Sequence, residues 1–189
     1  MAATPRLAPM LAAVGAVLGA VVGWGVGWTP MLAAWAYLTA LCVVLGYVDA
    51  RTRLLPTQLI APSYAVIGVL VGAAGLADGS LGLLERALLG WLVMGGFYFL
   101  MWQLAPGSLG YGDVRLSGLL ALCLGPLGWS QLVTGLYAGF LLGGITSGAL
   151  VLARRASRKT HIPFGPFMML GAVVGVVLGS SLGRWYALR

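Results

Sequence analysis

Long uncharged apolar runs make up most of this chain, and the charged residues lie in the short gaps between them. Residues 7–48 form an uncharged run of 42, and further uncharged runs occupy 54–77, 87–112, 116–153 and 162–183. A helix that crosses the hydrocarbon of a bilayer needs about 20 apolar residues. The first run is long enough for two spans joined by a turn near Gly25, Gly27 and Pro30. Residues 54–77, 87–112 and 162–183 each predict one span.

The run at 116–153 has 38 residues, which is long for one helix and short for two. It contains a helix-breaking segment, Gly125-Pro126-Leu127-Gly128. If the run crosses twice, the basic residues at 154–159 share a side with Arg6, Arg51, Arg53 and Arg115. The positive-inside rule favours that arrangement. We therefore expect about seven spans, with six as the alternative if this run is one kinked helix, a cytoplasmic N-terminus and an external C-terminus.

The composition predicts an all-α membrane helix bundle. Hydrophobic residues make up 60% of the chain, charged residues only 8%, and the mean hydropathy is +0.99. The 189 residues contain no long polar stretch, so we expect a single integral membrane domain over 1–189, in contact with lipid. The net charge of +7 comes from residues in the gaps between spans, where topology places them, and we expect no nucleic-acid partner.

Two of the four acidic residues are expected on the same side of the membrane, namely Asp49 and Asp113. Asp78 lies in a turn sequence between spans, and Glu85 is expected at the start of the next helix, where a negative charge is favourable. We predict no metal or cofactor site. Cys42 and Cys123 lie inside apolar runs without the spacing of a metal site.

Asp113 ends the segment Gly110-Tyr111-Gly112-Asp113, which we expect to be a loop. The helix that follows is predicted to run from Val114 to about Leu127. At about 1.5 Å per residue it rises only about 21 Å, less than the hydrocarbon thickness. Irregular backbone at that depth occurs where it is buried in protein or faces a wet cavity. We therefore expect Asp113 to face an internal site that water reaches.

Two carboxylates that converge on one water can hydrolyse a peptide bond. Because neighbouring like charges disfavour double ionisation, such a pair retains one proton. The single histidine of the chain, His161, has no cysteine near it in sequence with which to form a nucleophile–base pair. Simpler explanations stay open for each acid. Asp113 is a good helix cap, and Asp49 is close enough in sequence to pair with Arg51 or Arg53.

Three motifs in this order resemble those of the type IV prepilin peptidases, which belong to the GxGD class of intramembrane aspartic proteases. They are Asp49 followed by a basic linker and Leu55-Pro56-Thr57, the segment GYGDVRL at 110–116, and IPFGPF at 162–167. The resemblance implies that Asp49 and Asp113 form a catalytic pair at the cytoplasmic face. The residues that support the match are Gly110, Gly112, Pro56, Arg115, Pro163, Gly165 and Pro166.

The same resemblance implies a substrate: a pilin, pseudopilin or Flp-type precursor with a single apolar N-terminal helix, from which a short basic leader is removed. The chain has Thr57 where that family often has Asn, and Arg115 where it often has Lys. A short turn replaces the methyltransferase domain that many members carry, so we predict no N-methylation. IPFGPF also has a purely structural explanation as a helix start. The alternatives are a proton- or cation-coupled transporter that uses the same aspartates, and a noncatalytic membrane assembly factor.

Overall fold

The structure, a computed structural model, describes residues 7–104, 109–153 and 163–188. Every regular element in these ranges is a helix. In chain order they are α1 (Leu7–Val26), α2 (Leu32–Thr52), α3 (Thr57–Asp78), α4 (Leu81–Gly90), the π-helical segment η1 (Trp91–Gly95), α5 (Gly96–Leu104), α6 (Tyr111–Leu127), α7 (Trp129–Leu152) and α8 (Gly165–Ala187).

Six helical segments of the described chain are long and apolar enough to cross a membrane, with α4, η1 and α5 counted as one segment over Leu81–Leu104. The helix α6 is shorter, at 17 residues, and is a further member of the bundle. The prediction of an all-α, polytopic membrane helix bundle is confirmed. Its sequence basis is plain, because apolar residues cover the whole circumference of these helices rather than one face.

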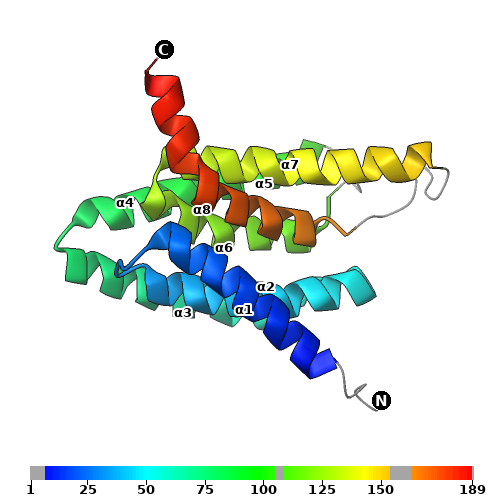
Figure 1. The fold of residues 1–189 in the computed structure, drawn as a ribbon, viewed down its shortest axis with the longest axis horizontal. Helices are drawn as coiled ribbons and strands as arrows, with labels where there is room; N and C mark the ends of the chain where they lie inside the picture. The colour runs from blue at the N-terminus through cyan, green and yellow to red at the C-terminus, as the bar shows by residue number, and fades with distance from the viewer. Residues whose placement is uncertain (1–6, 105–108, 154–162, 189) are drawn as a thin grey trace.

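The helix α6 lies inside the bundle (Figure 1). It packs against α3, α4, η1, α5, α7 and α8. Nearly all of its side chains from Asp113 to Pro126 are buried. Figure 1 also shows that the C-terminal end of α2 and the N-terminal end of α6 lie at the same end of the bundle. The two aspartates that the sequence singled out belong to these two helix ends.

Several predicted boundaries agree with the structure. The turn between α1 and α2 includes Gly27, whose φ of 69° suits glycine, and α6 and α7 are separated at Gly128, whose φ is 138°. Residues 116–153 therefore form parts of two helices, as the charge distribution favoured. The basic residues at 154–159, on which that argument depended, lie outside the described residues, as do Arg6 and His161.

Two predicted boundaries were wrong. The helix α6 begins at Tyr111, not at Val114, so the GYGD segment is a helix start rather than a loop. The fourth span begins at Leu81 and ends at Leu104, not at 87–112, and Glu85 lies inside α4. The second error came from treating charges as helix boundaries. Arg86 is exposed and its Nε donates to the carbonyl of Gly82 one turn earlier, so the helix accommodates this charge near its end.

The helices α7 and α8 form the closest pair in the bundle because glycines meet along their contact. A Cβ added to Gly171 would lie 2.5 Å from both the Gly135 carbonyl oxygen and the Gly139 nitrogen. At Gly175 it would lie 2.5 Å from the Gln131 carbonyl oxygen. Small residues that let two backbones touch are the usual basis of helix pairing in membranes. We call this contact the α7–α8 seam.

Candidate active site

Asp113 occupies the first turn of α6 and is only 8% exposed. Gly110 precedes the helix in an extended conformation, with φ −73° and ψ 142°. Its backbone N–H donates to Asp113 Oδ2 at 3.2 Å, and the Asp113 N–H donates to the Gly110 carbonyl at 3.0 Å. Asp113 thus does help to cap α6, but from its third position and not as the residue before the helix. The cap holds the carboxyl group in a fixed orientation.

Asp49 lies in the last turn of α2 and is 3% exposed. The helix ends three residues later at Thr52. The next residue, Arg53, adopts a left-handed conformation with φ 55°, and its N–H donates to the Asp49 carbonyl at 2.7 Å. No ion pair joins Asp49 to Arg51 or Arg53 in the described part of the chain, and the Arg51 guanidinium lies over the Tyr47 ring instead. The alternative of a simple interfacial ion pair is therefore wrong for Asp49.

The side chain of Asp49 is buried without full hydrogen bonding. Among the described residues, Asp49 Oδ2 has no hydrogen-bond partner. The backbone N–H of Gly165, at the start of α8, is near enough to act on the carboxyl group electrostatically, although it is not aligned as a hydrogen bond to Oδ2. A buried carboxyl oxygen that lacks a partner is costly. Such an atom is typical of a place where a substrate or water binds.

The three sequence motifs converge at this end of the bundle. Asp49 and Asp113 are near enough for the charge of one carboxyl group to act on the other. A Cβ added to Gly165 would lie 2.8 Å from Asp49 Oδ2, so this glycine leaves space for that carboxyl group. A Cβ added to Gly112 would lie 2.8 Å from Leu55 Cβ, which places the linker after α2 against the GYGD segment. The fold therefore assembles two buried carboxyl groups from α2 and α6 beside the start of α8.

Comparison with known proteins identifies the family. The type IV leader peptidase family matches residues 35–179, which is most of the chain. This chain belongs to the type IV leader peptidase family. The helix α1 lies before the matched region.

The curated relatives that match this chain include several prepilin leader peptidase/N-methyltransferases. The chain is 32% identical over 154 residues to a prepilin leader peptidase/N-methyltransferase of Aeromonas salmonicida, with 79% of this chain covered and 50% of the relative. A protein of that name from Pseudomonas aeruginosa is 28% identical over 158 residues, covering 82% and 51%. The chain thus spans about half the length of the curated relatives it matches. No solved structure gives a significant match.

Arg115 connects two motifs of this leader peptidase family member. Its Nη1 donates to Thr57 Oγ1 at the start of α3, and its guanidinium lies 4.4 Å from the centre of the Tyr111 ring. Pro56 precedes α3, and its carbonyl accepts the N–H groups of Leu59 and Ile60. Pro56 therefore positions the start of α3, while Arg115 ties that start to α6.

The IPFGPF segment has two roles in the structure. Pro163 precedes α8 and Pro166 lies in its first turn, where the missing N–H of proline costs nothing. Phe164 packs with Tyr98 and Phe140, at ring-centre distances of 6.3 and 5.4 Å. The segment was interpreted as structural, and its prolines fit that interpretation. Gly165 is different, because it lies directly against Asp49.

Sequence reasoning missed Tyr98 and Tyr64. Tyr98 in α5 is 1% exposed and lies near enough to Asp113 to interact with its charge. The Tyr64 hydroxyl in α3 donates to the Arg115 carbonyl at 2.7 Å, and so ties α3 to the first part of α6. The available signal was a phenol inside an apolar helix, since a buried tyrosine hydroxyl usually needs a partner.

No group of three His, Cys, Asp or Glu side chains within the described residues could hold a metal ion. Two carboxyl groups that can take up and release protons lie at this end of the bundle, with Tyr98 close to one of them.

Proposed function

We propose that this protein is an intramembrane aspartic endopeptidase that removes the leader peptide from prepilin-like precursors, and that Asp49 and Asp113 are its catalytic pair. The observation that carries the proposal is the meeting of these two buried carboxyl groups, from α2 and α6, in a chain of the leader peptidase family. The names of the relatives support the reaction, because they are prepilin leader peptidases.

The two carboxyl groups share one proton, since placing two negative charges together in a buried site is unfavourable. The ionised carboxylate takes a proton from a water molecule as that water attacks the carbonyl carbon of the scissile peptide bond. The protonated partner donates a hydrogen bond to the carbonyl oxygen. The tetrahedral intermediate then collapses, the proton moves to the leaving nitrogen, and the C–N bond breaks. Gly165 and Gly112 contribute by leaving room around Asp49 and Leu55.

The substrate of this reaction is a precursor with one apolar N-terminal helix and a short basic leader, of the pilin, pseudopilin or Flp type. The site works at the cytoplasmic face of the cell membrane. Arg51, Arg53 and Arg115 lie at the end of the bundle that carries the aspartates, and cytoplasmic ends are richer in such residues. A precursor anchored by its helix presents the leader junction at that boundary.

The test is cleavage of a purified precursor by the purified chain in liposomes, followed by mass spectrometry of the released leader. Asp49→Asn and Asp113→Asn are each expected to reduce the cleavage rate by about 10⁴-fold or more, because paired catalytic groups act as a unit. Asp78→Asn is the matched control, since Asp78 is exposed and ends α3. Cleavage at the wild-type rate by either site variant would remove that aspartate from the mechanism.

The same aspartates were considered for a proton- or cation-coupled transporter. That function predicts ion flux into liposomes that depends on Asp113, with no cleavage of any precursor. The family match and the position of both aspartates at one end of the bundle favour the peptidase, because transporters typically bind near the middle of the membrane.

A further inference from the structure

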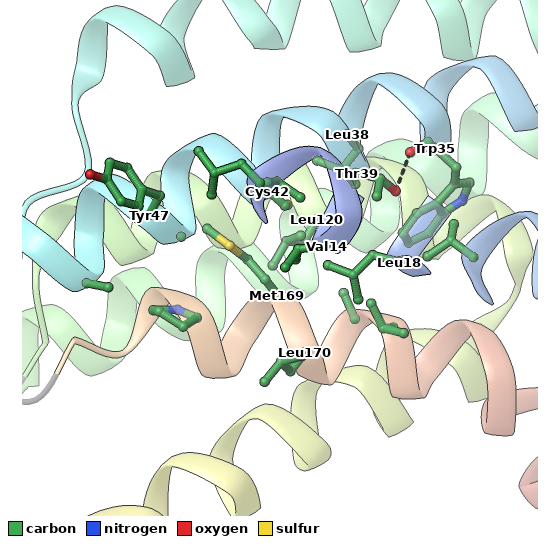
Figure 2. Close-up of a pocket in the computed structure, with 18 of the residues that line it drawn as sticks. Val14, Leu18, Trp35, Leu38, Thr39, Cys42, Tyr47, Leu120, Met169 and Leu170 are labelled. Carbon is green, nitrogen blue, oxygen red and sulfur yellow. Dashed lines mark hydrogen bonds between the residues drawn. The ribbon is translucent and has the colours of Figure 1, made fainter. Parts of the chain in front are cut away.

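An apolar groove runs beside the candidate site. It has a volume of about 340 Å³ and lies between α1, α2 and α8, with Leu120 of α6 also lining it. Figure 2 shows Tyr47 near one end of the groove and Trp35 near the other, with Cys42 and Met169 between them. Apart from Thr39 and the polar atoms of Tyr47 and Trp35, its lining is apolar. The described mechanism does not use this groove.

One end of the groove lies beside the aspartate site, although neither aspartate lines it. Tyr47 and Ala50, both in the last turns of α2, line the groove and flank Asp49 in sequence. Pro166 also lines it and follows Gly165, the residue that lies against Asp49 Oδ2. From Asp49 to Trp35 the groove follows about 14 residues of α2, or roughly 21 Å. The groove therefore ends beside the turn of α2 that carries Asp49 and extends from there along most of the length of α2.

We propose that this groove binds the apolar helix of the precursor and so positions the leader junction at Asp49 and Asp113; the inference rests on the proposed function. The scissile bond lies next to that helix, so the helix must pack against the protein with its end at the aspartates. A whole helix, about 10 to 12 Å wide, is too large for a cavity of this volume, but one ridge of its side chains fits. Gly46 and Ala50 allow the close approach that helix packing in membranes needs.

Trp35 lines the end of the groove away from the aspartates. It is 2% exposed, and its indole Nε1 is shielded from solvent and has no hydrogen-bond partner among the described residues. The groove therefore offers apolar contact at this depth as well, which suits an apolar helix.

The helix α1 forms one wall of the groove. Among its described side chains only Val22 and Val26 are buried, and it packs mainly on α2 and α8. It also lies before the region that the family match covers. Both aspartates therefore lie in the region that the family model matches, whereas α1, one of the three helices that form the groove, lies outside it.

Cysteine crosslinking tests the position of the helix. The chain has two cysteines, and Cys42 lines the groove while Cys123 is fully buried. In an Asp113→Asn, Cys123→Ala background the precursor stays intact and Cys42 is the sole thiol. Precursors that carry one cysteine at successive helix positions are treated with a short thiol crosslinker. We expect the strongest product about seven residues beyond the scissile bond, because Cys42 and Asp49 are about 10 Å apart along α2.

The matched control moves the thiol to the α7 surface, with Leu141→Cys and Cys42→Ala; Leu141 is 61% exposed. Products at position 141 as abundant as those at Cys42 overturn the proposal. A second result also overturns the proposal: Cys42 reacts with a thiol-reactive acyl-chain probe but forms no crosslink to the precursor. The groove then holds lipid. If Cys42 crosslinks at the expected register but the wild-type chain cleaves no precursor, the docking inference stands and the peptidase function fails.

Kinetics provide a second measurement in an active enzyme. Cys42→Phe fills the groove and is expected to raise KM for the precursor about tenfold with kcat within twofold, the pattern of lost ground-state binding. Unchanged KM in Cys42→Phe, with cleavage intact, overturns the groove proposal and leaves the peptidase function in place.

Discussion

Glycines gather in two regions of this molecule, and their neighbours differ. Along the α7–α8 seam, a side chain on Gly171 or Gly175 would collide with the backbone of the opposite helix. At the aspartate site, a side chain on Gly165 would meet the Asp49 carboxyl group, and one on Gly112 would meet Leu55. Backbone atoms of a packed helix cannot move away, whereas a side chain can rotate. The seam glycines should therefore control stability, and the site glycines should control activity.

The largest effect on stability is expected at the seam. Gly171→Ala should lower the free energy of unfolding by about 2 kcal/mol, because overpacking a tight contact forces the backbones apart. Thermal unfolding of the purified protein in detergent measures this change. Gly144→Ala on α7 is the matched control, since a Cβ there meets no atom within 4 Å. It should be neutral or slightly stabilising, as alanine favours helix. Equal stability of the two variants would contradict the division between the regions.

At the site, Gly165→Ala should reduce kcat/KM for precursor cleavage by about 100-fold, while unfolding stays close to wild type. The added Cβ would lie 2.8 Å from Asp49 Oδ2 and displace the carboxyl group. A displacement of about 1 Å in a catalytic group is enough for a loss of that size. Cleavage kinetics and thermal unfolding are measured on the same preparation. A large loss of stability in this variant would place Gly165 with the seam glycines.

Gly112→Ala tests the site glycines further, because the side chain that its Cβ would meet, Leu55, can itself be removed by substitution. The added Cβ would lie 2.8 Å from Leu55 Cβ, and we expect about a tenfold loss of cleavage from the altered start of α6. Leu55→Gly removes that contact, so the double variant should recover most of the activity. The double-mutant cycle then gives a coupling of about 1 kcal/mol. Additive losses would show that Gly112 acts through something other than Leu55.

The smallest effect is expected at Arg115, whose side chain touches neither glycine region. Arg115→Lys should reduce cleavage by about two- to fivefold, since lysine keeps the charge but loses the planar contact with Tyr111 and the directed bond to Thr57. Thr57→Val should have a similar effect, and the two changes together should add little. A loss of 100-fold or more in Arg115→Lys would mean that this residue acts in the reaction itself.

Much of this fold could be predicted because apolar length and charge position are properties of the chain alone. The turn at Gly27 and the separation of α6 from α7 followed from glycine and proline breaks. The start of α6 did not, because the bond from the Gly110 N–H to Asp113 extends the helix back through a segment with two glycines. The start of α4 was missed because an exposed arginine is compatible with a helix interior.

The candidate site could be predicted only as far as it depends on the order of residues along the chain. Asp49 and Asp113 were predicted to form a pair because both were expected on the same side of the membrane. In the structure the end of α2 and the start of α6, which carry them, lie at the same end of the bundle. The neighbours of Gly165 and Gly112 were not predictable, since these contacts join segments more than 50 residues apart along the chain. Thirty glycines look alike in the sequence, and only packing separates those that face a carboxyl group from those that face a backbone.

The capping bond of α6 also distinguishes the two oxygens of one carboxyl group. Asp113 Oδ2 accepts the Gly110 N–H, so this oxygen acts as the carbonyl-like acceptor. In the protonated acid, the hydroxyl hydrogen is then favoured on Oδ1. The helix start thus makes the two carboxyl oxygens inequivalent. Oδ2 is held by the backbone, and Oδ1 carries the exchangeable hydrogen. The backbone of a glycine, which has no side chain to contribute, would set the direction in which that hydrogen points.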